Sequence, residues 1–362
     1  MRIDILVDSE AFLRVFFQDV FSAKERIYIQ AMTFEADSAG MQVWNAIRNA
    51  CAKEKRMLVD SYTKVMISDR FVYSPSNWRD PKFWSEVKAT HALFREAEAQ
   101  GIRMRYTNPL GFMLWNYPPR NHKKIIVIDN TVYVGGLNFS DHNFSWHDMM
   151  IRLHSEKPNP IAERLAEDFL FSWRGENRGN IWSEDSVEFF FLDGKNNARL
   201  FQHLFSYIEQ ARESIFIETP YLSFPFFKLF HRLAKTGISV NLLAPGKNNK
   251  PWMESYMFWE VQKSPIRLWL LSSQMTHLKA IRVDDRYLIV GSSNFDFVSY
   301  RCQQELIVVF RDPRVIRLFR EKVEKPDLAR AVLWEGKRVG VSHAVRAGVL
   351  YMIGVLLGLW SL

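Results

Sequence analysis

Two matching segments constrain this chain more than any other feature of its sequence. Residues 122–129 are His-Lys-Lys-Ile-Ile-Val-Ile-Asp, and residues 277–284 are His-Leu-Lys-Ala-Ile-Arg-Val-Asp, so the pattern His-x-Lys-x-x-x-x-Asp occurs twice. Each copy runs on into a Gly-x-x-Asn sequence, at residues 135–138 and 291–294. One copy alone would be weak evidence, because three fixed residues match by chance on the order of once per ten thousand positions. Two copies with matching tails indicate an internal duplication.

The duplication extends beyond these segments. Residues 23–32 match residues 211–220, and both sequences predict a helix end that leads into a strand. Helical stretches follow at residues 40–55 and 226–235. Alternating strands and helices favour an α/β architecture. We therefore expect two pseudo-symmetric lobes, each folded as an α/β sandwich.

The polar link at residues 174–180 is the expected domain boundary. It separates an N-terminal lobe at residues 1–178 from a C-terminal lobe at residues 179–335, and a hydrophobic tail follows at residues 336–362. Since each lobe carries one copy of the pattern, we expect the lobes to share one active site at their interface, where ligand pockets commonly form.

The spacing within each segment has a physical meaning. Both segments are rich in Ile and Val and predict a buried strand that enters a hairpin. Side chains alternate along a strand, so each histidine shares a face with the lysine two positions later. These pairs are His122 with Lys124 and His277 with Lys279. The closing aspartates face the other way and are expected to be turn or scaffold residues; they are Asp129 and Asp284.

Two imidazoles and two ammonium groups suit a phosphodiester. The lysines and the amides of Asn138 and Asn294 can bind non-bridging oxygens and stabilise charge in the transition state. One neutral histidine can attack phosphorus while the other, protonated, donates to the leaving oxygen, so the step needs no metal. Each histidine needs an acceptor that fixes its tautomer, and Asp148 and Glu305 are the candidates. For either acid alone, a surface salt bridge is the alternative.

On these residues the chain resembles the phospholipase D superfamily, and within it the bacterial cardiolipin synthase branch. The resemblance covers nearly the whole chain, and it implies a phosphohistidine intermediate on His122 with His277 as the general acid. The symmetry of the sequence itself would allow the reverse assignment. Two positions depart from the family pattern: Gly136 replaces a frequent Ser, which removes one hydroxyl near the phosphate, and Leu278 replaces a small residue, which narrows the pocket beside His277.

Composition agrees with this interpretation without deciding it. The chain has 362 residues with 48% hydrophobic content, enough for two cores. Its net charge of +8 favours an anionic partner, either a phospholipid surface or nucleic acid. Cys51 and Cys302 give neither metal-ligand spacing nor a disulfide framework, and no motif indicates a cofactor.

The C-terminal segment suggests a membrane. Residues 347–362 carry no charge and follow Lys337, Arg338 and Arg346, whereas the N-terminus lacks a secretory signal pattern. We expect an anchor or deeply inserted tail that holds the protein at the bacterial inner membrane. The alternative is a C-terminal helix packed on the body of the protein. The segment is a little shorter than the roughly twenty residues of a usual spanning helix.

An aromatic loop at residues 112–117 gives a second indication of lipid contact, because such side chains can line an acyl-chain channel or enter the membrane interface. Packing in the core is the alternative. Several basic residues could contact head groups or simply be solvated; they are Arg103, Arg105, Arg120, Lys123, Lys247 and Lys250.

The expected function depends on what meets the phosphohistidine. A lipid alcohol, such as the head group of phosphatidylglycerol, would give cardiolipin, whereas water would give phosphatidic acid. We favour transfer over hydrolysis, and both over a nuclease or a non-enzymatic scaffold. The expected partners are anionic and zwitterionic phospholipids and the bilayer, with no nucleic acid and no obligate protein partner.

Overall fold

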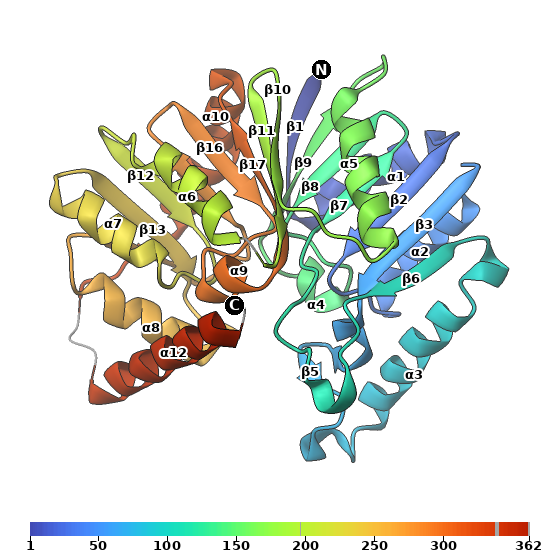
Figure 1. Ribbon diagram of the computed structural model, residues 1–362, viewed down its shortest axis with the longest axis horizontal. Helices are drawn as coiled ribbons and strands as arrows, with labels where there is room; N and C mark the ends of the chain where they lie inside the picture. The colour runs from blue at the N-terminus through green and yellow to red at the C-terminus, as the bar shows by residue number, and fades with distance from the viewer. Residues whose placement is uncertain (196, 337–339, 361–362) are drawn as a thin grey trace. The chain divides into compact units, whose positions relative to one another are not determined.

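The computed structural model describes residues 1–195, 197–336 and 340–360, and the chain divides into two compact units, residues 1–178 and 179–362. Each unit has a mixed β-sheet with helices on both faces (Figure 1). This arrangement confirms the predicted α/β class and the two lobes. Residues 336–362, expected to form a separate tail, fall within the second unit.

The sheet of the first unit has the strand order β1-β9-β8-β7-β2-β3-β6. Its β2, β3 and β6 are parallel, and the other neighbours are antiparallel. The strands are β1 (Arg2–Val7), β2 (Arg26–Ala31), β3 (Glu54–Asp60), β6 (Arg103–Thr107), β7 (Ile125–Ile128), β8 (Thr131–Gly135) and β9 (Met149–His154), with a separate pair β4 (Met66–Ile67) and β5 (Arg70–Phe71). The helices are α1 (Asp8–Ser22), α2 (Ser38–Asn49), α3 (Pro81–Arg95), α4 (Asp141–Phe144) and α5 (Pro160–Trp173).

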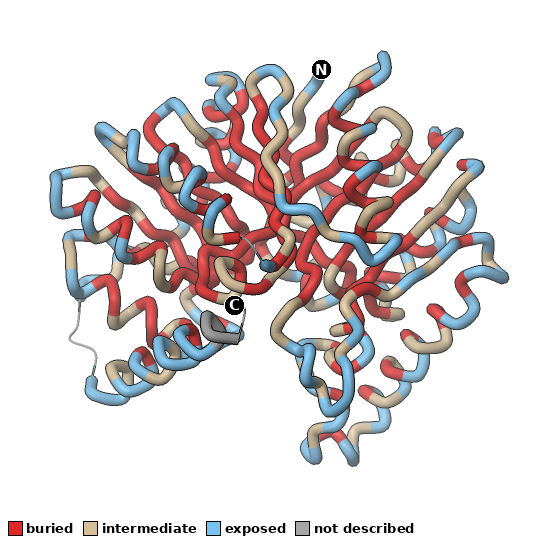
Figure 2. Tube along the Cα trace, in the orientation of Figure 1, coloured by how far each residue is buried: buried red, intermediate tan, exposed pale blue. Residues whose placement is uncertain are grey.

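Alternation along β2 explains how this sheet is covered. Ile27 and Ile29 belong to the core that contains the α1 and α2 side chains Phe12 and Trp44. Tyr28 points to the opposite face and stacks on Phe169 of α5, with ring centroids 4.8 Å apart. The central strands are therefore buried on both faces, as Figure 2 shows for the strands of both units.

The sheet of the second unit has the order β10-β11-β17-β16-β15-β12-β13-β14-β18. Its strands are β10 (Asn180–Glu184), β11 (Val187–Asp193), β12 (Ser214–Glu218), β13 (Ser239–Pro245), β14 (Arg267–Leu271), β15 (Ala280–Val283), β16 (Tyr287–Gly291), β17 (Gln304–Phe310) and β18 (Val332–Leu333). The helices are α6 (Asn197–Ile208), α7 (Phe226–Lys235), α8 (Pro251–Val261), α9 (Phe297–Arg301), α10 (Pro313–Phe319), α11 (Lys325–Arg330) and α12 (Val341–Trp360), and a π-helical turn spans Arg320–Glu324.

The order β7-β2-β3 of the first sheet recurs as β15-β12-β13 in the second. In both, the motif strand pairs antiparallel with the central strand, which pairs in parallel with the next. Helices α6 and α7 pack on one face of the second sheet, whereas Phe319 of α10 meets Phe216 of β12 on the other, with ring centroids 6.3 Å apart. The repeated sequence therefore builds the same local sheet twice.

The C-terminal helix packs on the protein, which is the alternative given above for the tail. Helix α12 contacts α8 and α9, and Figure 1 shows it beside α8. Ala347 is buried, and Gly354 lies so close to the ring of Phe224 that an added Cβ would be 2.0 Å from it. Among the described residues, no helix combines the length and the apolar character needed to cross a membrane. The expectation that the tail anchors the protein in or on the membrane is not supported. Residues 337–339 and 361–362 of the expected tail lie outside the described residues.

Candidate active site

The motif residues of the first unit meet at one end of its sheet. Strand β7 pairs antiparallel with β8, and β8 pairs antiparallel with β9. His122 precedes β7, Asn138 follows β8, and Asp148 precedes β9. Antiparallel pairing therefore places all three at the same end of these strands. In the second unit, His277 precedes β15, Asn294 follows β16, and Glu305 is the second residue of β17, so these three also lie at one end of their strands.

In the first unit, the histidine and lysine of the motif are buried and adjacent. His122 is only 5% exposed, and Lys124 only 2%. The Lys124 amine donates to the carbonyl oxygen of His122 at 2.9 Å. Asn138 is also buried, and its side-chain oxygen accepts a long hydrogen bond from the backbone N–H of Thr33 at 3.4 Å. The side chains of Lys124 and Asn138 are thus held by the backbone of their own unit.

In the second unit, the lysine contacts the histidine ring itself. The Lys279 amine lies 2.9 Å from Nδ1 of His277 and also donates to its carbonyl oxygen. Tyr221 approaches the same imidazole edge-on, with ring centroids 6.4 Å apart. Within the described part of the chain, the side-chain oxygen of Asn294 has no hydrogen-bond partner although the residue is buried. A buried polar atom of this kind suits a site that a polar ligand enters.

The two candidate acids are placed by different neighbours. In the first unit the Asp148 carboxylate accepts from the backbone N–H of Met149 at 2.8 Å, and a Cβ added to Gly136 would lie 2.3 Å from it. In the second unit, the Ser292 hydroxyl donates to Glu305 and accepts from the N–H of Leu306 at 3.0 Å. The hydroxyl that Gly136 lacks is therefore, in its second-unit counterpart, bonded to the acid.

The closing aspartates of both motifs bind backbone. Asp129 accepts hydrogen bonds from three consecutive N–H groups at the start of β2, those of residues 24–26, at 2.8–3.0 Å. Asp284 does the same at the start of β12, for the N–H groups of residues 212–214, at 2.8–3.0 Å. Both have a φ of 48°, in the left-handed region that Asp adopts more readily than most residues. Burial raises the pKa of Asp284, but the three N–H donors outweigh it and lower the pKa overall. These carboxylates join the motif hairpin to the central strand.

Two anchoring pairs were not predicted from the sequence. The Gln30 amide donates to the side-chain oxygen of Asn121 at 2.9 Å, and the Thr276 hydroxyl donates to Glu218 at 2.6 Å. Gln30 and Glu218 occupy matching positions of the central strands, and Asn121 and Thr276 each precede a motif histidine. The sequence feature that could have revealed these pairs is a polar residue at the same position in both copies of a mostly apolar strand.

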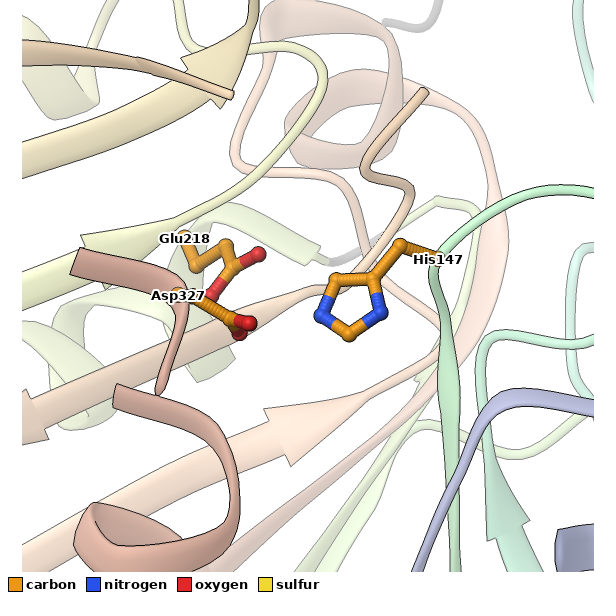
Figure 3. Close-up of side chains that lie close together, drawn as sticks. All are labelled: His147, Glu218 and Asp327. Carbon is orange, nitrogen blue, oxygen red and sulfur yellow. The ribbon is translucent and has the colours of Figure 1, made fainter. Parts of the chain in front are cut away.

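Carboxylates gather at two further places. Carboxylate oxygens of Glu218 and Asp327, both of the second unit, lie within 4.8 Å of each other, and Figure 3 shows them side by side. In the first unit, oxygens of Glu35, Asp37 and Glu86 lie within the same distance. Burial raises the pKa of Glu35 to about 9 and that of Asp37 to about 6. Because a protonated carboxyl such as that of Glu35 is a poor metal ligand, we assign no metal centre to this cluster of the first unit.

Two of the basic residues considered for head-group contact are buried in ion pairs instead. The Lys123 amine contacts both oxygens of Asp168 on α5, at 2.8 and 2.9 Å. The Arg120 guanidinium donates to Asp60 at 2.8 Å. These two ion pairs hold the start of the motif segment and the residues just before it to α5 and β3. The other four are exposed; they are Arg103, Arg105, Lys247 and Lys250.

Comparison with known proteins identifies the family to which this chain belongs. A family model described as cardiolipin synthase, phospholipase D-like domain, matches residues 17–173 and 204–326. The chain belongs to this family. It is therefore a cardiolipin synthase-like enzyme of the phospholipase D superfamily, as the repeated motif predicted. The match covers the motif strands of both units.

Individual relatives are distant in sequence but similar along most of the chain. Cardiolipin synthase 1 of Staphylococcus epidermidis is 23% identical over 355 residues, covering 90% of this chain and 67% of the relative. Cardiolipin synthase B of Escherichia coli K12 is 24% identical over 354 residues, covering 89% and 79%. The crystal structure of phosphatidylserine synthase from Haemophilus influenzae Rd KW20 superposes with a TM-score of 0.67 at 16% identity, covering 98% of this chain and 93% of that one. This last likeness establishes the fold.

Proposed function

We propose that the protein transfers a phosphatidyl group between phospholipids, and that its product from phosphatidylglycerol and a second phospholipid is cardiolipin. The observation that carries this proposal is the duplicated set of His, Lys and Asn at matching ends of two sheets, in a chain similar to cardiolipin synthases. One phosphodiester would be served by both sets. A lipid substrate also agrees with the net charge of +8.

The proposed reaction has two steps. A nitrogen of His122 attacks phosphorus, the bond from phosphorus to the leaving alcohol breaks, and His277 donates its proton to the leaving oxygen. The incoming glycerol hydroxyl then attacks the phosphohistidine, gives its proton to His277, and breaks the bond from phosphorus to nitrogen. The phosphatidyl group changes partners without net consumption of water.

The remaining motif residues stabilise charge in this scheme. Lys124, Lys279 and the amides of Asn138 and Asn294 bind the non-bridging oxygens, where negative charge accumulates in the transition state. Their burial makes each such hydrogen bond stronger than it would be in water. Asp148 and Glu305 act as acceptors that orient the imidazoles.

We also propose that the aromatic loop meets the bilayer. The side chains of Phe112 and Trp115 are 87% and 74% exposed, and Met113 projects beside them. The loop ends close to Arg120, whose guanidinium donates to the backbone oxygens of Asn108, at 2.8 Å, and of Asn116. An exposed aromatic group on an anchored loop directly before a catalytic motif suits the membrane interface. A membrane-associated location would follow.

Mass spectrometry of lipids tests the proposal. The purified chain is incubated with phosphatidylglycerol and phosphatidylethanolamine in mixed micelles, with His122→Ala as the inactive variant. The matched control is His203→Ala, which removes a half-exposed histidine outside both motifs. We expect cardiolipin from the wild type and from His203→Ala only. Phosphatidic acid without cardiolipin would replace the proposal with a hydrolase, and unchanged lipids would exclude phospholipid turnover under these conditions.

A further inference from the structure

A groove of about 970 Å³ lies within the second unit, between α7, α8 and α12. This volume is in the range of small-molecule sites, about 300–1,000 Å³. Its apolar lining comes from all three helices and the segment before α7: Phe224, Phe227, Tyr256, Trp259, Ala347 and Tyr351. A Cβ added to Gly348 would meet nothing within 4 Å. The α12 side of the groove is therefore open at this glycine, and no residue of either motif lines it.

One rim of the groove is cationic. Lys228, Arg232 and Lys235 line it from α7. Their spacing of four and three residues puts all three on one face of that helix. The opposite face is apolar and packs in the core of the unit, through residues that include Leu229 and Phe230. The cations therefore form a row along the mouth of an apolar groove.

The one acid among the residues that line this groove already has basic partners. Glu260 accepts from Nε2 of His231 at 3.0 Å and from the amine of Lys263. Burial raises the pKa of Glu260, but these two hydrogen bonds outweigh it and lower the pKa overall, so the carboxylate is charged and paired. Arg232 of the rim forms an ion pair with Glu209. Among the described residues, neither Lys228 nor Lys235 forms one. The rim therefore has positive charge left for an anionic ligand.

We propose that this groove is a binding site for an anionic phospholipid, with one acyl chain against the aromatic floor and the phosphate on the α7 cations. An apolar floor with a cationic rim complements one amphipathic anion, because both of its parts find partners at once. A zwitterionic lipid would fill the same floor but gain less at the rim. The site is separate from the motif residues, and its test does not depend on the proposed reaction.

Photo-crosslinking locates the bound lipid. The probe is phosphatidylglycerol with a diazirine in its acyl chain, used with the His122→Ala chain so that turnover does not consume it. Crosslinked peptides are identified by mass spectrometry. We expect labelling of α8 and α12, and we expect unlabelled phosphatidylglycerol to compete about tenfold better than phosphatidylcholine. Labelling confined to peptides outside α7, α8 and α12 would overturn the site.

Two variants test the two halves of the proposal. Gly348→Trp should fill the groove and reduce labelling of α8 at least tenfold, whereas Gly348→Ala should not. Lys228→Glu with Lys235→Glu should abolish the preference for phosphatidylglycerol over phosphatidylcholine. Its matched control is Lys195→Glu with Arg199→Glu, which makes the same charge change at two exposed positions, one before α6 and one within it. Equal competition by both lipids in the wild type, or unchanged labelling in folded Gly348→Trp, would refute the proposal.

Discussion

The two units hold their candidate acids by different means. The first pairs Gly136 with Asp148, so closely that a Cβ on the glycine would lie 2.3 Å from the carboxylate. The second pairs Ser292 with Glu305, and the hydroxyl donates to the longer acid. A short acid is thus accommodated by removing a side chain, and a long one is fixed by adding a donor. The difference teaches that Gly136 is matched to its own acid, so replacing it by the family's usual Ser would not restore a missing function.

The largest contrast we expect lies between the two histidines. His122→Ala and His277→Ala should each reduce turnover of phosphatidylglycerol by about a thousandfold, within the range of general acid–base effects. A substrate with p-nitrophenol as the leaving group needs little protonation of that group. It should therefore restore first-step cleavage in His277→Ala by at least about a hundredfold, and in His122→Ala hardly at all. Release of p-nitrophenol is the measurement.

Rescue of His122→Ala instead of His277→Ala would reverse the assigned roles and leave the duplicated site intact. Phosphohistidine trapping provides the control, because only the variant that keeps the attacking histidine can retain the phosphorus label after acid-free denaturation.

Glu35 should make the free energy of unfolding depend on pH, and the second unit has no acid at the matching position. Its counterpart in the second unit is Ser223, since both donate their backbone N–H to the residue after a motif asparagine, Phe139 and Phe295. Burial raises the pKa of Glu35 from 4.5 to about 9. Between these values the folded state binds more protons than the unfolded state, so the free energy of unfolding should fall as pH rises. The slope can reach about 1.4 kcal/mol per pH unit.

Glu35→Ser should flatten this dependence between pH 5 and pH 9, and urea unfolding monitored at several pH values measures it. The matched change in the second unit, Ser223→Ala, should leave the slope as it is in the wild type. An unchanged slope in Glu35→Ser would mean that Glu35 is ionised in the folded protein.

Gly136→Ser tests the accommodation of Asp148 directly. Its Cβ would overlap the carboxylate, so we expect the free energy of unfolding to fall by about 1–3 kcal/mol, the usual cost of overpacking. Turnover should fall as well, because the acid is displaced. Urea unfolding and lipid turnover measure the two effects.

Adding Asp148→Glu to Gly136→Ser copies the arrangement of the second unit. Partial recovery in this double variant would show that the two positions act as a pair, in the sense of a double-mutant cycle. If the losses of stability and turnover from the two substitutions simply add, positions 136 and 148 act independently of each other.

Much of the fold follows from the repeat, and the reasons are local. Both copies predicted a strand that enters a hairpin, and β7 and β15 are those strands. His122 and Lys124, expected on the strand itself, lie just before β7. The pairs Gln30–Asn121 and Glu218–Thr276 escaped prediction because each joins residues far apart in the sequence. The pattern of apolar residues along a strand does not identify the distant residue with which a polar side chain of that strand forms a hydrogen bond.

Prediction from the sequence has the same limit for the charge of Lys123 and for the hydrophobic C-terminal helix. The sequence around Lys123 does not show that its amine forms a buried ion pair with Asp168 of α5. An uncharged C-terminal segment looks alike whether it packs against lipid or against protein. The small residues Ala347 and Gly354 lie on the face of α12 that approaches the body, where Tyr351 also meets the ring of Phe224. In both cases the environment of the residue depends on which distant part of the chain packs against it.

Ser292→Ala is the smallest change and the sharpest for the comparison. It keeps the Cβ and removes only the hydroxyl that donates to Glu305 and accepts from the N–H of Leu306. A hydrogen bond to a charged group is worth about 1.5–3 kcal/mol, less what the acid regains from other donors. We therefore expect a loss of about 1–2 kcal/mol in unfolding free energy by urea titration. Ser293→Ala, whose hydroxyl bonds only to the carbonyl of Asn294 at 2.9 Å among the described contacts, is the matched control and should cost less. Equal losses in the two variants would remove the special role of the Ser292 hydroxyl, and with it the argument that the longer acid needs a donor where the shorter one needs space.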